Sequence, residues 1–287
     1  MRRFVGSQRC TKTHQDTPAR RSGRRLTGLC AYWCLLCVSL WPNFFSCSSD
    51  KAARTDTPTY TLIFLDKTRS VNTDKPFVAD KYRRALTDIV EQNIRHTGDK
   101  LDLYYVHDNT AKARALTWTV RATTDDLTHA SFTDREAAEA EFSLALTREK
   151  AQLRQRVLAQ LVTPNTGASN QATDLWASLP VIANAVASGL PVHVYYLSDM
   201  RESVPIRPGS PTIRRDFEKQ PPADNAQADE WAKADAKALR QYALNSAIVT
   251  LILPFAPNAS VRENNPAVTQ YWQTLFSELG AGNVTEE

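Results

Sequence analysis

An apolar segment that ends on a carboxylate is the feature that most constrains this chain. Residues 62–65 form a continuous apolar run, which is typical of a strand covered on both faces in a parallel sheet. Asp66, Thr68 and Ser70 follow at alternate positions. Ligands of open α/β sheets bind in such loops, and oxygen ligands suit a hard cation such as Mg²⁺. The alternative is a simple turn of Asp, Ser and Thr that caps the next helix.

Further apolar segments alternate with helical patterns. The predicted strands are 59–65, 101–107, 116–122, 192–197 and 247–253. The predicted helices cover about 76–96, 133–161, 173–188, 229–244 and 266–279. This alternation predicts an α/β fold, Rossmann-like and doubly wound, with a mainly parallel central sheet flanked by helices. Asp108 and Asn109 indicate a turn, so the second and third strands are expected to be antiparallel.

Several local signals set the expected boundaries. Asp74 is expected to cap the first long helix, and Asn265, followed by Pro266, the last one. Thr133 and Glu136 have the spacing of a capping box. Residues 201–228 are rich in Pro and charge and are expected to form a surface loop.

A second carboxylate is expected at the same edge of the sheet, because the apolar segment 192–197 is followed by Ser198 and Asp199. Strand 59–65 is expected to be central and adjacent to this segment. Together with Thr173, these elements resemble the von Willebrand factor type A-like (VWA-like) family. That family has a metal-ion-dependent adhesion site built from D-x-[ST]-x-S, a distant Thr and a later Asp at a strand end. Asp66 with its two hydroxyl neighbours matches the first element, Thr173 the second and Asp199 the third.

The resemblance, which covers about 59–280, implies one bound Mg²⁺ or Mn²⁺. The implied metal ligands are Asp66, Thr68, Ser70, Thr173 and Asp199. Water, or a carboxylate from a partner, would complete the coordination, so the expected partner is a protein that presents an acidic group. Two departures are a predicted count of five strands, where the family usually has six, and a long insert after Asp199.

The first 47 residues have the features of an export signal. An arginine-rich start precedes an apolar run over 26–45, and Ser46-Cys47 follows. This pattern resembles a bacterial lipoprotein signal, which implies lipidation at Cys47; the alternative is an uncleaved membrane anchor. We therefore expect a signal segment 1–47, a tether 48–58 and a VWA-like domain 59–287. The domain would be anchored by lipid in the bacterial cell envelope, facing the periplasm or the cell surface.

Charge and cysteine content exclude several classes for the rest of the chain. The first 46 residues hold eight Lys and Arg and one Asp, so the remainder has a net charge of −3 and no strong attraction for nucleic acid. No cysteine follows Cys47, which excludes a disulfide framework, a zinc–thiolate site and a cysteine nucleophile after that position.

Three function classes remain open. The favoured one is a metal-dependent protein-binding module on a membrane-anchored lipoprotein, which is not an enzyme. The second is a structural or assembly lipoprotein with the same fold and no metal. The third is a phosphatase-like hydrolase with Asp66 as nucleophile, although such enzymes require a second Asp where this chain has Thr68.

Overall fold

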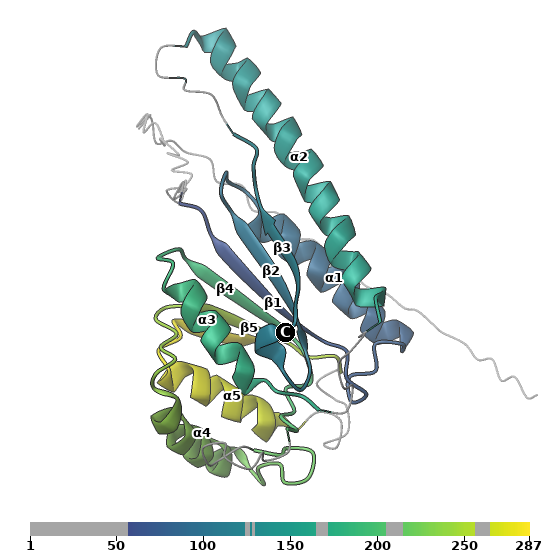
Figure 1. Ribbon diagram of the computed structural model, residues 1–287, viewed down its shortest axis with the longest axis vertical. Helices are drawn as coiled ribbons and strands as arrows, with labels where there is room; N and C mark the ends of the chain where they lie inside the picture. The colour runs from purple at the N-terminus through teal and green to yellow at the C-terminus, as the bar shows by residue number, and fades with distance from the viewer. Residues whose placement is uncertain (1–56, 124–126, 128–129, 165–171, 205–214, 256–264) are drawn as a thin grey trace, which may run out of the picture. The chain divides into compact units, whose positions relative to one another are not determined.

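The computed structural model of this protein describes residues 57–123, 127, 130–164, 172–204, 215–255 and 265–287 (Figure 1). These residues belong to a unit that runs from Ala53 to Glu287. The predicted signal segment, the lipidation site Cys47 and nearly all of the predicted tether 48–58 lie outside the described residues. None of the helices in the described part is long and apolar enough to cross a membrane.

A six-stranded sheet in the order β3-β2-β1-β4-β5-β6 forms the centre of the fold. The strands are β1 (Tyr60–Asp66), β2 (Lys100–Val106), β3 (Arg114–Thr119), β4 (Val192–Leu197), β5 (Ile248–Ile252) and β6 (Asn283–Glu286). All neighbouring strands are parallel except β2 and β3, which form an antiparallel pair. β1 lies between β2 and β4, so its central position beside β4 is confirmed.

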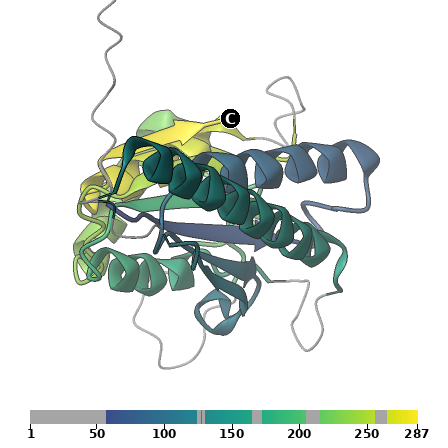
Figure 2. The same ribbon diagram turned by 90° about the horizontal axis from the view of Figure 1, so that it is seen from above.

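Helices cover both faces of this sheet (Figure 2). They are α1 (Pro76–Asn93), α2 (Phe132–Val162), α3 (Leu179–Val186), α4 (Asn225–Leu239) and α5 (Pro266–Glu278), with short 3₁₀ turns at Thr110–Lys112 and Trp176–Ser178. Alternate residues of β1 supply the two cores, because successive side chains of a strand point to opposite faces. Leu62 and Phe64 pack with α3, α4 and α5, whereas Ile63 and Leu65 pack with α1 and α2. The predicted α/β, doubly wound fold class is therefore confirmed.

The structure tests two predictions about the strands, namely the pairing of the second with the third and the number of strands. The predicted turn and antiparallel pairing of the second and third strands are confirmed. The predicted count of five strands was wrong, because Asn283–Glu286 adds a sixth strand parallel to β5. The segment is short and mostly exposed, so it lacks the apolar run by which a buried strand is recognised.

Two of the three expected helix caps were wrong. α1 begins after Lys75 and no side chain caps it, whereas α2 is capped by Ser131, whose side chain accepts from the N–H of Asp134. The cap of α5 by Asn265 is confirmed. The predicted helix over 173–188 is a 3₁₀ turn followed by the shorter α3, and the one near 229–244 is α4, which starts at Asn225.

The segment after β4 is not a plain surface loop. Of its described residues, Glu202 and Val204 are buried, and Phe217 packs in the core with α4 and α5. Residues 205–214 of the predicted loop lie outside the described part. The chain on either side of them is therefore tied into the domain.

Candidate functional site

The two predicted carboxylates come from adjacent parallel strands. Asp66 is the last residue of β1, and Asp199 lies two residues after the end of β4. Leu65 pairs with Leu197 in the parallel register. Both strands therefore end at the same edge of the sheet, as the sequence predicted.

Asp66 is fully buried, and three hydrogen bonds hold its carboxylate. Oδ1 accepts from the main-chain N–H of Thr68 at 2.9 Å and from the hydroxyl of the same residue at 2.6 Å. Oδ2 accepts from the hydroxyl of Ser198 at 2.6 Å. The carboxylate is thus oriented from both sides by groups of its own loop and of the strand next to it.

The hydroxyls continue this network to the second carboxylate. Oγ1 of Thr68 lies 3.1 Å from Oγ of Ser70, and the side chain of Ser70 forms a hydrogen bond with that of Asp199. Oδ2 of Asp199 is buried and has no hydrogen-bond partner among the described residues; Nε of Arg201 lies 3.6 Å from it. Four of the five predicted ligands therefore form one cluster.

Burial makes ionisation of these carboxyls unfavourable. Burial, and then the nearby charge of Asp199, raise the pKa of Asp66 to about 7, although the hydrogen bonds from Ser198 and Thr68 act in the opposite direction. Burial also raises the pKa of Asp199, opposed by the positive charge of Arg201 and the hydrogen bond from Ser70. Without a cation, the pair favours holding a proton.

Thr173, the fifth predicted ligand, is buried in the loop before α3. Its N–H donates to Oγ of Ser203 at 3.0 Å, and its carbonyl accepts from the N–H of the same serine at 3.0 Å. Ser203 follows Asp199 closely in the chain. The main chain of Thr173 therefore joins its loop to the loop that begins at Asp199.

Ser198 and Tyr82 are two members of the site that were not predicted. The hydroxyl of Ser198 accepts from the N–H of Met200 at 3.0 Å and donates to Asp66. Tyr82 of α1 is fully buried, and its hydroxyl has no hydrogen-bond partner in the described part of the chain. Burial, then the charges of Asp66 and Asp199, raise the pKa of Tyr82 well above its usual value. Helical periodicity gives Tyr82 a core position and carries no signal that it lies near the carboxylates.

The donor set fits a hard divalent cation. It consists of carboxylate and hydroxyl oxygens, which Mg²⁺ and Mn²⁺ prefer, and it offers no nitrogen or sulfur ligand. Among the described residues no three His, Cys, Asp or Glu side chains gather into a metal-binding group, so hydroxyls and water would have to supply the other ligands. Oδ2 of Asp199, which accepts no hydrogen bond from the described residues, is a buried acceptor of the kind that such a cation would satisfy.

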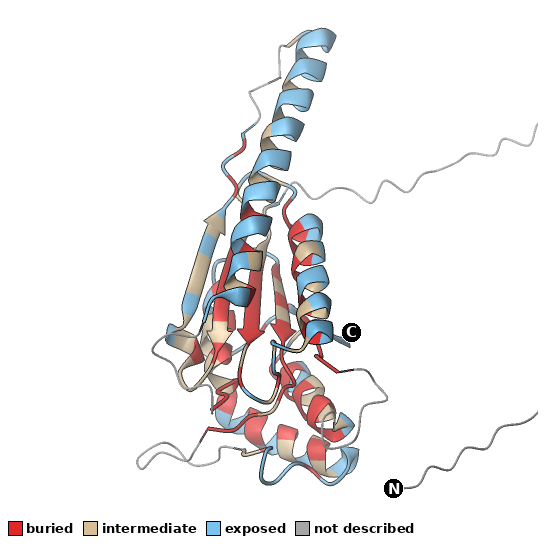
Figure 3. Cartoon of the chain, turned by 90° about the vertical axis from the view of Figure 1, so that its right-hand side faces the viewer, coloured by how far each residue is buried: buried red, intermediate tan, exposed pale blue. Residues whose placement is uncertain are grey.

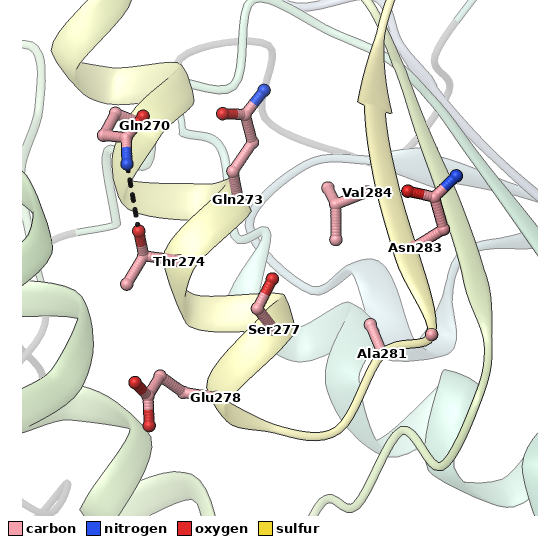
Figure 4. A pocket seen from close by; sticks show the side chains of 9 residues that line it. Gln270, Gln273, Thr274, Ser277, Glu278, Ala281, Asn283 and Val284 are labelled. Carbon is pink, nitrogen blue, oxygen red and sulfur yellow. Dashed lines mark hydrogen bonds between the residues drawn. The ribbon is translucent and has the colours of Figure 1, made fainter.

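A surface hollow of about 640 Å³ lies elsewhere, along α5 and β6 (Figure 4). Its lining is mostly amide and hydroxyl side chains, including Gln270, whose amide donates to the hydroxyl of Thr274 at 3.3 Å. It contains none of the five predicted metal ligands. The hollow is therefore separate from the carboxylate site.

Comparisons with known proteins found similarity only among solved structures, at low identity and low TM-score. No family model matches the sequence, and no curated protein matches it. An aerotolerance-related membrane protein of Bacteroides fragilis is similar in structure, with 12% identity, a TM-score of 0.35 and coverage of 80% of this chain and 91% of that one.

Two further solved structures are similar over part of their length. Proximal thread matrix protein 1 of the mussel byssus, described with a zinc-occupied MIDAS motif, has 10% identity, a TM-score of 0.34 and coverage of 80% of this chain and 42% of that one. A von Willebrand factor type A protein of Catenulispora acidiphila has 14% identity, a TM-score of 0.29 and coverage of 76% and 43%. This chain thus spans less than half of both.

Proposed function

We propose that residues 59–287 form a metal-dependent protein-binding module. One Mg²⁺ or Mn²⁺ would be held by Asp66, Thr68, Ser70, Thr173 and Asp199, partly through water. The observation that supports this most is the buried cluster in which Asp66 and Asp199, each with a raised pKa, share a network of hydroxyls. A divalent cation would remove the repulsion between the carboxylates and the cost of their burial.

The chemistry of such a site favours capture of an acidic group. Two carboxylates and neutral hydroxyls leave a divalent cation short of ligands, and a carboxylate from another protein can fill the remaining position. The partner would therefore present an Asp, a Glu or a chain terminus. Attachment of the module to a bacterial envelope membrane through lipid at Cys47 is part of the same proposal, and it rests on the sequence pattern alone.

The alternatives are weaker on specific grounds. In a hydrolase, Asp66 would need a free oxygen to act as nucleophile, but both of its oxygens accept hydrogen bonds in a buried setting. A structural lipoprotein without metal would have to balance the two carboxylates with protons or with Arg201, which is 3.6 Å from Asp199. We therefore propose that the protein is not an enzyme and that metal binding distinguishes the first function from the second.

Thermal unfolding of the full chain tests the proposal. With millimolar Mg²⁺ or Mn²⁺, at about a hundred times the dissociation constant, the melting temperature should rise by about 5 to 10 °C over that in chelator. The rise should disappear in Asp66→Asn and Asp199→Asn. It should persist in Asp88→Asn, a matched change at an exposed residue of α1. An identical wild-type melt in metal and in chelator would rule out the metal-dependent function.

A further inference from the structure

Helix α2 is the least covered of the α-helices in the described domain. It has 31 residues, yet only Leu153, Val157 and Leu161 are buried, all in its C-terminal half. Of the five large apolar side chains exposed in the described part, three lie on this helix: Phe132 (75%), Leu144 (59%) and Val162 (77%). Figure 3 shows the exposed N-terminal half extending beyond the sheet. Such exposure is uncommon on a surface that faces only water.

The contacts of the C-terminal half define which face of α2 is free. Lys150 and Arg154 reach Glu91 of α1, and Arg156 lies over the ring of Trp118 in β3, 5.0 Å from its centre. The core contacts of α2 lie between these flanks. With about 100° of rotation per residue, Leu144 lies on the opposite face.

An apolar line runs along that free face. Ala137, Leu144 and Ala151 repeat at intervals of seven residues, which places them within about 20° of one line. Val162 lies five turns after Leu144 on the same line. All four residues are exposed. The line is narrow, which suits pairing with another helix rather than burial against a sheet.

Charge divides the same helix into two halves of opposite sign. Residues 132–145 contain four acidic residues and one Arg, whereas residues 146–162 contain four basic residues and one Glu. A parallel neighbour with the same sequence would place like charges together. An antiparallel neighbour with the same sequence would place the acidic half against the basic half.

The positions of individual charges fix one register for that antiparallel pair. Ala145 is midway between Glu136 and Arg154, which are five turns apart and therefore share one flank of the free face. Glu141 and Arg148 share the other flank, and their midpoint lies between Leu144 and Ala145. The two centres differ by only half a residue, and both lie within one residue of Leu144. In this register Leu144 would lie against its own counterpart close to a two-fold axis.

We propose that α2 is a homodimerisation helix that pairs antiparallel with α2 of a second copy of this chain. Glu136 would pair with Arg154 of the second copy, and Glu141 with Arg148 of the second copy. The helix is about 46 Å long at 1.5 Å per residue, so its full length could take part in the contact. A second copy fits this face better than an unrelated partner because the helix is complementary to itself in both charge and register.

The dimer would give the proposed binding module two sites, a consequence that depends on the proposed function. Lys67, next to Asp66, donates from Nζ to the carbonyl of Gln160 at 2.9 Å, so the carboxylate site lies near the C-terminal end of α2. Antiparallel pairing puts the two C-terminal ends at opposite ends of the helix pair. The two sites would then engage two separated groups of a partner or surface and bind by avidity.

Charge-reversing substitutions on α2 test the dimer. The self-association of the full-length chain is measured in detergent solution. Sedimentation over about 1 to 100 µM should give a mass of two copies for the wild type. Glu136→Arg with Glu141→Arg, or Arg148→Glu with Arg154→Glu, should each raise the dissociation constant at least about tenfold. A 1:1 mixture of these two variants should associate, because one then carries a basic helix and the other an acidic one. A single chain with all four changes should dimerise again.

Two controls separate this surface from others. Lys233→Glu with Lys237→Glu changes the charge of the exposed side of α4 by the same amount and should leave the dimer intact. Melting temperatures should show that every variant is folded. A wild type that stays monomeric up to about 100 µM, or a dimer insensitive to the α2 reversals, overturns the inference. Neither result affects the metal-dependent melting that tests the proposed function.

Discussion

The hydroxyl of Ser198 donates a 2.6 Å hydrogen bond to Oδ2 of Asp66 and thereby joins the ends of β4 and β1. The hydroxyl oxygen of Ser198 also accepts a hydrogen bond from the N–H of Met200 at 3.0 Å. Met200 has a positive φ of 59°, which is uncommon for a residue with a side chain. One hydroxyl therefore orients the first carboxylate and holds the turn that follows the second, Asp199.

Replacement of Ser198 by Ala should destabilise the protein by about 1 to 3 kcal/mol, because a buried carboxylate loses one of its donors. It should also raise the pKa of Asp66 further, since the lost hydrogen bond favours the ionised form. Denaturant unfolding at pH 8 in chelator measures the change. Ser188→Ala removes the same atom from a hydroxyl that bonds only to the carbonyl of Ala185. An equal loss in both variants would contradict a special role for Ser198.

The stability of the metal-free protein should fall as pH rises toward 7. Burial raises the pKa of Asp66 from 3.8 to about 7, so between these values the folded protein holds a proton that the unfolded chain releases. A group with a raised pKa in the folded state stabilises it fully below pH 3.8 and loses this effect through pH 7. Melting in chelator between pH 5 and 8 measures the slope, and Asp66→Asn should flatten it. Stabilisation by Mg²⁺ should grow over the same range, since metal and proton compete. A wild-type slope equal to that of the Asn variant would refute the assignment.

Replacement of Tyr82 by Phe should leave the metal-free protein as stable or make it slightly more so. Its buried hydroxyl has no hydrogen-bond partner among the described residues, and the charges of Asp66 and Asp199 raise its pKa, so its removal costs no hydrogen bond there. Tyr271→Phe is the matched comparison, because that hydroxyl donates to Asp235 at 2.9 Å. We expect Tyr271→Phe to lose about 1 to 3 kcal/mol in chemical denaturation. If Tyr82→Phe loses as much, its hydroxyl has a role that these contacts do not explain.

Lys67 should anchor the site loop to α2. Its ammonium group donates to the carbonyls of Gln160 and Thr163 at the end of that helix and lies 3.8 Å from the ring centre of Tyr105. Lys67→Met keeps the apolar stem but removes these bonds and the favourable charge at a helix C-terminus, at a cost of about 1 kcal/mol. Amide hydrogen exchange of residues 67–72 should accelerate in this variant. Lys67→Arg, which keeps the charge and the donors, should stay close to the wild type.

The sequence was informative where polar side chains directly follow an apolar strand. Asp66 and Asp199 could be assigned to one sheet edge because strands that are buried on both faces have a clear apolar pattern. β6 could not be found in this way, since it is only four residues long and pairs through its backbone. Ser131 rather than Thr133 caps α2, which residue preference alone does not separate because both types favour caps.

The parts of the site that could not be predicted depend on contacts between segments that are distant in the sequence. Helical periodicity places Tyr82 in the core, but it does not say which groups of the sheet lie opposite. Glu202 and Phe217 lie in a segment whose Pro and charge content indicates a surface loop, yet both are buried by contacts with the rest of the domain. Such placements follow from tertiary packing, which local sequence patterns do not specify.

The indole of Trp272 on α5 donates from Nε1 to the carbonyl of Met200 at 2.7 Å, one residue from Asp199. This buried ring has a direct bond to the turn that would have to adjust when a cation arrives. Its fluorescence should therefore report movement of that turn without any attached label. Trp272 is therefore an intrinsic fluorescence probe of the carboxylate site. Comparison of the wild type with Trp272→Phe identifies the part of the tryptophan emission that comes from this residue.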